Sequence, residues 1–281
     1  MNSFLTFIEN MPVWGRLVWV VLIMVLFWTL EGYYSFVNLK YRKWKHAATN
    51  LTFLLFTLVI NVLFGIVTAG VFIWLDQSHF GLLNWIDLPV WAQLVLCVMA
   101  LDFIAQYVAH YMLHKIKWLW KLHIVHHSDT QVDVTTGTRH HPLDYIVRET
   151  FALGAIVIMG MPVAYYLVYR LLSVFFTYFN HANISLGKAD KILSYVIVTP
   201  DMHKFHHHFE MPWTDTNFGN IFSFWDRIFG TMVYDDPKKI VYGLDIVDSS
   251  KGENVGYQLS IPFRKEIHSK NKVNTTKETI S

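Results

Sequence analysis

Eight histidines stand in three short clusters whose spacing suits metal binding. HYMLH covers residues 110–114, HIVHH covers 123–127 and HKFHH covers 203–207. Spacings of three and four residues place side chains on one face of a helix, so each cluster can direct several imidazoles at one ion. The eight candidate ligands are His110, His114, His123, His126, His127, His203, His206 and His207.

Eight imidazoles exceed the needs of one tetrahedral zinc ion, which takes at most four ligands. Imidazole also binds copper, nickel and iron, so two metal ions sharing the clusters is the simpler interpretation. The H-E-x-x-H pattern of zinc proteases is absent. His181, in FNHAN, is a ninth candidate, and a weaker case exists for His140, His141 and His208. His46, His79 and His268 have no partners at metal-binding spacing.

Asp102 begins a stripe of polar residues that leads to the first cluster. Asp102, Gln106, His110 and His114 follow one another at four-residue steps and therefore share one side of a helix. A carboxylate inside a membrane helix is costly and indicates function. We expect Asp102 to accept a hydrogen bond from a ligating imidazole. Direct ligation and an ion pair with Arg170 are the alternatives.

The elements that must position these residues are membrane helices. Hydrophobic residues make up 53% of the 281 residues and charged residues only 16%, against about 25% charged in soluble domains. Apolar runs at 13–30, 47–75 and 89–109 are each long enough to cross a bilayer. The net charge of +2 predicts no nucleic-acid partner, and the single cysteine, Cys97, is expected to be a small buried hydrophobe.

A further apolar run, 150–179, is interrupted by Gly160 and Pro162. A continuous helix here would rise about 45 Å and carry His181 away from the other histidines. A hairpin near Pro162 would return it to them, so we predict two shorter segments. Arg170, within this run, should face protein or water.

Basic residues indicate how the chain is oriented. They occur between the first two apolar runs and after the third, whereas the loop at 76–88 has none. The positive-inside rule therefore places the histidine clusters on the cytoplasmic side. We expect an all-α integral membrane protein of about four to five membrane helices or hairpin segments, with a cytoplasmic histidine-rich helical cap. Its membrane would be a bacterial inner membrane or the endoplasmic reticulum.

Three regions are expected along the chain. Residues 1–88 would be N-terminal membrane anchor helices, 89–235 the catalytic domain of membrane helices and two-metal cap, and 236–281 a polar tail. The Lys-, Asn- and Thr-rich segment 264–281 is predicted to be disordered.

The ordered motifs resemble the fatty acid hydroxylase superfamily, also called the sterol desaturase family. They are the three histidine clusters, FNHAN, TPDMHKFHHH, DTNFGN and WDRIFGT, and the resemblance covers roughly 95–235. It implies a helical membrane domain below a cytoplasmic cap, a non-haem centre of two iron ions and O2-dependent oxidation of a lipid carbon. The ligands it implies are His110, His114, His123, His126, His127, His181, His203, His206 and His207.

The resemblance also bears on the electron donor. FNHAN and TPDMH look like the branch that contains alkylglycerol monooxygenase, which implies a tetrahydropterin. No HPGG haem-binding motif is present, so the donor is expected to be separate, either the pterin or a protein of cytochrome b5 or ferredoxin type. Hydroxylases of the family often have a further histidine pair where this chain has only His181.

The histidine clusters and the apolar runs are compatible with three classes of function. The first is O2-dependent hydroxylation or desaturation of an aliphatic carbon of a membrane lipid such as a fatty acyl, ether lipid or sterol-like substrate. The second is a metal-dependent membrane lipid hydrolase with a metal-bound water as nucleophile. The third, a metal transporter, fits less well, because a transporter needs ionisable residues along several spans and here they gather beyond the third.

Overall fold

The computed structural model describes residues 1–39, 41–210, 213–265 and 267. These residues form helices joined by loops, and their only β pairing is two isolated bridges. The predicted all-α membrane fold is confirmed. The predicted disorder of 264–281 falls almost entirely outside the described residues.

Three helical segments among the described residues are long and apolar enough to cross a membrane: Val13–Tyr34, Lys43–Asn84 and Val90–Lys115. They match the three predicted apolar runs, and the third begins one residue later than predicted, at Val90. The first is α2 (Val13–Tyr34), and the second holds α3 (Lys43–Ser78) and a 3-10 turn, Leu82–Asn84. The third comprises α4 (Val90–Leu101), a π-helix (Asp102–Val108) and α5 (Ala109–Lys115). With 36 residues, α3 rises about 54 Å and so exceeds a hydrocarbon core of about 30 Å.

The predicted hairpin is confirmed by α7 (Pro142–Met159) and α8 (Val163–His181). Gly160 ends α7 with a φ of 63°, a left-handed conformation that glycine adopts without strain. Pro162 then precedes α8, where its fixed φ and missing N–H suit a helix start. The hairpin brings His181 back to the end of the bundle that carries the other histidine clusters.

The turn of the hairpin packs closely against the loop after α3. A Cβ atom on Gly81 would lie 2.3 Å from the backbone nitrogen of Gly160, and one on Gly160 would lie 2.2 Å from the carbonyl oxygen of Phe80. Both glycines also have positive φ values. This contact therefore requires glycine on both sides.

The main apolar core lies between α4, α7 and α8, with α1 (Asn2–Glu9) against it. Cys97, Leu101 and Ile156 are fully buried there, which confirms the expected role of Cys97. Much of the surface of α2 and α3, in contrast, carries exposed large hydrophobic side chains. Such a surface is typical of helices that face lipid.

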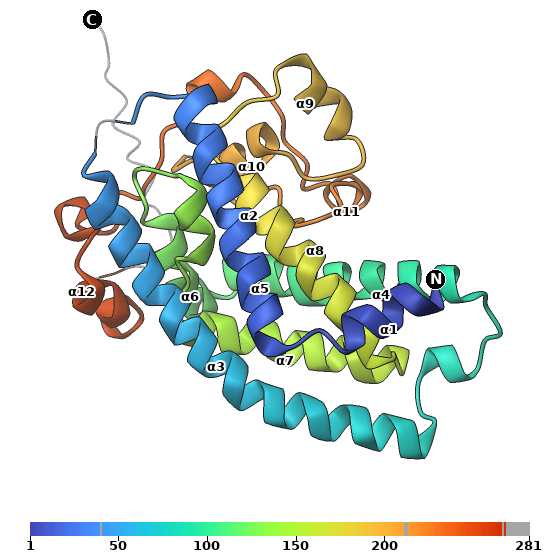
Figure 1. Cartoon of the computed structure of the whole chain (residues 1–281). Helices are drawn as coiled ribbons and strands as arrows, with labels where there is room; N and C mark the ends of the chain where they lie inside the picture. Colours follow the sequence, from blue (N-terminus) through green and yellow to red (C-terminus); the bar gives the residue numbers. More distant parts are fainter. Residues whose placement is uncertain (40, 211–212, 266, 268–281) are drawn as a thin grey trace, which may run out of the picture.

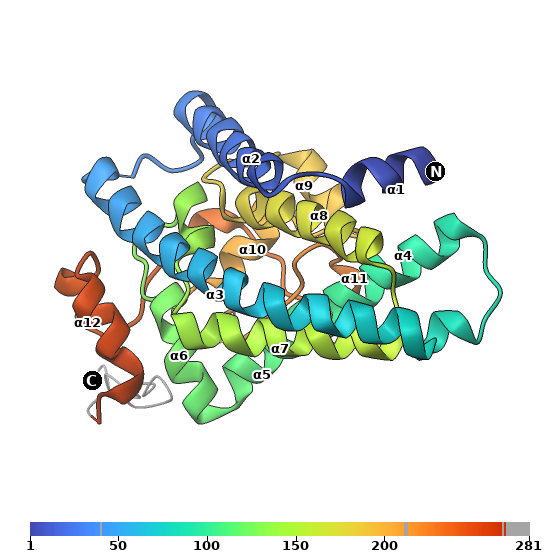
Figure 2. The ribbon, with the colours of Figure 1, turned by 60° about the horizontal axis from the view of Figure 1, so that its bottom comes forward.

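The remaining helices build the histidine-rich end. They are α6 (Lys117–His127), α9 (Lys188–Leu193), α10 (Pro200–His206), α11 (Phe224–Ile228) and α12 (Val255–Ser260), with 3-10 turns at Val134–Thr138, Pro237–Lys239, Ser249–Lys251 and Ile261–Phe263. Figures 1 and 2 show the loop between α3 and α4 at the end of the bundle opposite α12. Contacts of α10 with α8, and of α6 with α5 and α7, join this end to the bundle.

Candidate metal centre

All nine histidines predicted as ligands come together in two adjacent groups. Within each group, one nitrogen from every ring lies within 4.8 Å of the others. The five-histidine group contains His110, His114, His123, His127 and His206, and the four-histidine group contains His126, His181, His203 and His207. Each H-x2-H-H motif supplies residues to both groups, because its middle histidine, His126 on α6 or His206 on α10, belongs to a different group from the other two.

Several ring nitrogens face each other directly. The Nε2 atoms of His110 and His123 are 3.0 Å apart in the five-histidine group. In the four-histidine group, Nε2 of His181 lies 3.2 Å from that of His126 and 3.1 Å from that of His203. Convergence of ring nitrogens from α5, α6, α8 and α10 is the arrangement that an imidazole-bound cation needs.

Other buried nitrogens have no hydrogen-bond partner among the described residues. Nε2 of His114, His127, His206 and His207 all belong to this set. Buried polar atoms are nearly always paired, and leaving one unpaired costs about 1–3 kcal/mol. Unpaired nitrogens concentrated in both groups fit bound metal ions at these positions.

Burial also holds the rings in the form that binds metal. Loss of hydration lowers the pKa of His123 to about 3. It likewise places the pKa values of His127, His203, His206 and His207 well below their usual value, and neighbouring imidazoles add to the effect. These rings are therefore neutral at neutral pH, so a lone pair is free for a cation.

Backbone carbonyls fix the orientation of three rings. Nδ1 of His110 donates to the carbonyl of Phe218 at 2.9 Å. Nδ1 of His181 donates to Thr177 and Nδ1 of His206 to Thr216, each at 2.7 Å. Since a carbonyl only accepts, Nδ1 carries the proton and Nε2 keeps the lone pair. Metal-binding histidines commonly have this second hydrogen bond.

Two carboxylates that the sequence interpretation missed serve the same purpose. Asp144, fully buried, has Oδ2 2.7 Å from Nδ1 of His123 and Oδ1 3.0 Å from Nε of Arg148. Asp215 has Oδ1 3.3 Å from Nδ1 of His114. Their motifs, HHPLD and DTNFGN, are visible in the sequence, but the histidine that each one contacts depends on the fold.

The prediction that Asp102 accepts a hydrogen bond from a histidine ring is wrong. Asp102 accepts hydrogen bonds from the backbone N–H groups of Ile221 and Phe222 and from the Trp225 indole, at 3.0–3.1 Å. Eight residues of helix, about 12 Å of rise, separate it from His110, and the π-helix breaks the four-residue repeat. Asp102 thus anchors the start of α11 and the segment before it.

Arg170 has a different partner as well. It forms an ion pair with Glu149 on α7 at 2.5 Å and donates to Asn61 and Tyr145 at 3.0 Å and 2.7 Å. The expectation that Arg170 faces protein is confirmed, and the alternative of a pair with Asp102 is not.

The weaker histidine candidates lie outside the two groups. His140 stacks on His126 with ring centroids 4.4 Å apart and has Nδ1 3.4 Å from Asp144. His141 accepts the backbone N–H of Leu143 at the start of α7, and His208 accepts that of Val241. The last two stabilise local backbone.

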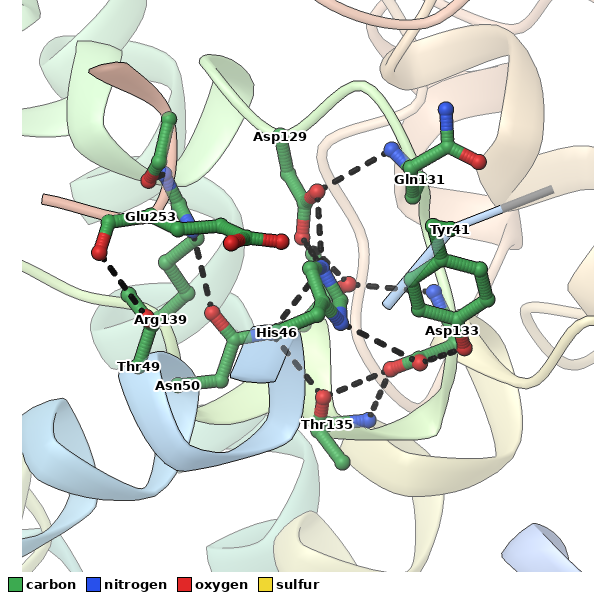
Figure 3. A network of polar contacts seen from close by, with 12 residues as sticks. Tyr41, His46, Thr49, Asn50, Asp129, Gln131, Asp133, Thr135, Arg139 and Glu253 are labelled. Carbon is green, nitrogen blue, oxygen red and sulfur yellow. Dashed lines mark hydrogen bonds and ion pairs between the residues drawn. The ribbon is translucent and has the colours of Figure 1, made fainter. Parts of the chain in front are cut away.

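His46 organises the segment that follows the α6 histidines (Figure 3). Its Nε2 atom lies 2.9 Å from both carboxylate oxygens of Asp129, and its Nδ1 atom lies 3.3 Å from Asp133. The Tyr41 hydroxyl donates to Asp133 as well. Because Asp129 follows His127 by two residues, this buried network fixes the exit of α6 against α3.

A cavity of about 180 Å³ lies beside the centre, among the long helices of the bundle. His140 and Thr177 line it, and so connect it to His126 and His181. Its walls come mainly from α3, α7, α8 and the π-helix. A cavity of about 150 Å³ accommodates a benzene-sized group, so this one admits part of a lipid rather than a whole chain.

The fold and the two histidine groups define a helical membrane protein with a candidate two-metal site. Comparison with protein families identifies it further, because residues 94–231 match the model for fatty acid hydroxylase. This chain belongs to the fatty acid hydroxylase superfamily, as its motifs predicted.

Curated relatives agree with this assignment. An ornithine lipid hydroxylase, OlsE, of Rhizobium tropici is 29% identical over 157 residues, which cover 55% of this chain and 45% of the relative. Human alkylglycerol monooxygenase is 27% identical over 179 residues, or 63% of this chain and 38% of the relative. The chain thus aligns with less than half the length of these relatives. No solved structure matches it.

Proposed function

We propose that this protein is a membrane-bound lipid monooxygenase, in which the nine histidines hold two iron ions and O2 is used to hydroxylate an aliphatic carbon. The observation that carries the proposal is the division of nine buried rings into groups of five and four, each converging within 4.8 Å. Bound iron would supply the activation of O2 that attack on an unactivated C–H bond requires.

The protein's own residues would supply orientation and exclusion of water. Carbonyl and carboxylate partners hold the rings with Nε2 free, and the buried surroundings keep bulk water from the reacting centre. The cavity would receive the part of the lipid that is oxidised. His140 and Thr177, which line the cavity and contact His126 and His181, would then hold that part next to the four-histidine group. The rest of the lipid would extend along the helices toward the bilayer.

The names of the relatives support a lipid with a polar headgroup as substrate, because one acts on an ornithine lipid and the other on an alkylglycerol. We favour hydroxylation over desaturation as the reaction, because both relatives are named for the insertion of an oxygen atom. The electron donor would be a separate tetrahydropterin or a small redox protein. The histidine-rich end would face the cytoplasm, in keeping with the basic residues near it.

The test is a comparison of metal and turnover in one preparation. Purified full-length protein should contain about two iron ions per chain. Membranes of cells with and without it should differ by lipids that have gained one oxygen atom, with 18O2 labelling the product. One bound zinc per chain, or lipid turnover under strict anaerobiosis, would contradict the monooxygenase and favour the hydrolase.

A matched control is His208→Ala. His208 adjoins the HKFHH motif but lies outside both groups, and its Nδ1 atom accepts the N–H of Val241. This variant should keep its iron and its product, whereas His207→Ala should lose about one of two iron ions per chain and all of its product. Equal iron content in the two variants would remove His207 from the ligand set.

A further inference from the structure

An exposed apolar surface lies on the histidine-rich end of the molecule and includes none of the nine candidate ligands. It consists of residues at the end of α9 and on α11, and we name it the α9–α11 patch: Ile192, Leu193, Tyr195, Val196, Ile228 and Phe229. Ile192 is 70% exposed, Val196 58% and Ile228 64%. Large apolar side chains gathered at one place on a surface mark a site of interaction.

The two parts of the patch form one surface. The guanidinium of Arg227 on α11 stacks on the Tyr195 ring at 4.4 Å and donates to the carbonyl of Ser194. Ser223 donates to the same carbonyl, and Ile197 pairs with Phe222 in an isolated β-bridge. The residues following α9 are therefore fixed against α11.

The patch packs against the third membrane span. Phe229 stacks on Phe103 at 5.5 Å and on Tyr107 at 5.3 Å, and both of these lie in the segment Val90–Lys115. Figure 1 shows α11 next to the helix that α4 begins, with α9 beyond it. Because Phe229 is also exposed, a lipid beside the third span at this level would reach the patch.

The exposed charges of the two segments that carry the patch have one sign. Both acidic side chains of residues 188–197 and 222–230 are fully buried. Asp190 accepts hydrogen bonds from Thr199 and Tyr234, and Asp226 from the backbone of Phe218 and Gly219. The basic side chains are all exposed: Lys188, Lys191 and Arg227. Exposed cations bordering apolar side chains complement the headgroups of an anionic leaflet.

We propose that the α9–α11 patch is inserted into the membrane interface, with its apolar side chains in the outer acyl region and its basic side chains among anionic phospholipid headgroups. The cap would then be held to the bilayer at the patch as well as by its membrane helices. This role is independent of the metal and of the reaction.

The chain's single cysteine makes a direct test possible, because Cys97 is buried and can be replaced by alanine. In that background, Ile192→Cys, Val196→Cys and Ile228→Cys would each carry a fluorescent label. The full-length protein would be placed in lipid nanodiscs of phosphatidylcholine and phosphatidylglycerol. Lys238→Cys, exposed elsewhere on the cap, is the aqueous control, and Ile66→Cys on α3 is the control that faces lipid.

Labels on the patch should be quenched by a nitroxide near the lipid headgroup and several-fold less by aqueous iodide than the label at 238. The label at 66 should respond most to a nitroxide deep in the acyl chains. Iodide quenching equal to that at 238 would overturn the proposal, because the patch would face water. Protection from both quenchers would overturn it too, because protein, such as a second copy of the chain, would then cover the patch.

Discussion

The carboxylate of Asp144 joins His123 to Arg148: one oxygen lies 2.7 Å from Nδ1 of the histidine, and the other lies 3.0 Å from Nε of the arginine. Arg148 in turn donates to Gln106, which lines the cavity. The orientation of one imidazole is thus connected to a residue at the cavity wall. Asp144 is thus the carboxylate that accepts a hydrogen bond from a histidine ring, a role that the sequence predicted for Asp102.

Replacement of Asp144 should weaken metal binding without removing a ligand. Asp144→Asn keeps the shape of the side chain but removes the charge that supports the His123 ring and pairs with Arg148. Loss of such a partner typically lowers metal affinity about 10–100-fold. The measurement is iron retention against a competing chelator.

Asp245→Asn is the matched control, since Asp245 is exposed and lies outside the metal centre. It should hold iron as the wild type does. If Asp144→Asn released its iron only at the chelator concentration that the wild type requires, Asp144 would have no part in orienting His123.

The two histidine groups should be separable by substitution. His203→Ala removes a ring from the four-histidine group only, and His114→Ala removes one from the five-histidine group only. We expect each variant to lose about one of two iron ions per chain and all lipid turnover, because both ions act together. Elemental analysis of folded protein provides the count. Loss of both ions in each variant would show that the groups fill only as a unit.

Asp102 should matter for stability rather than for metal binding. Asp102→Ala would leave two backbone N–H groups and an indole N–H buried without their acceptor, at a cost of about 3 kcal/mol or more. The expected result is a clearly lower unfolding temperature in detergent with wild-type iron content in the fraction that remains folded. Loss of iron at an unchanged unfolding temperature would show instead that Asp102 supports metal binding.

Filling the cavity should block the substrate while leaving the metal in place. Val174 lines the cavity from α8, so Val174→Phe would take up part of its 180 Å³. We expect normal iron content and at least a tenfold loss of turnover on a long-chain lipid, since a displaced substrate carbon reacts slowly. Val59→Phe, on the exposed face of α3, should have no effect. Equal activity of the two variants would place the substrate elsewhere.

Local features of the fold could be read from the sequence because they depend on neighbouring residues. Apolar runs predicted the segments that are long enough to cross a membrane, and Gly160 with Pro162 predicted the hairpin of α7 and α8. Spacings of three and four residues gave the histidine clusters, whose nine members meet in the structure. His181, a candidate ligand on a separate helix, required only the further prediction that the hairpin returns the chain to the other histidines.

Partners that are distant in the chain could not be read in this way. The carbonyl of Phe218 meets His110 across 108 residues, and no pattern near either residue reports that contact. The π-helix at Asp102–Val108 is equally hidden, because nothing in DFIAQYV distinguishes it from an ordinary helix. His46 has no histidine at metal-binding spacing in the sequence, and its partners in the structure are the carboxylates of Asp129 and Asp133.

The contact between Gly81 and Gly160 has a consequence at the other end of the molecule. It fixes the start of α8 against the loop after α3, and α8 is stiff over its 19 residues, or about 28 Å. His181 is the last residue of that helix. The depth at which its imidazole meets His126 and His203 is therefore set partly by two residues that have no side chain, on the far side of the bundle.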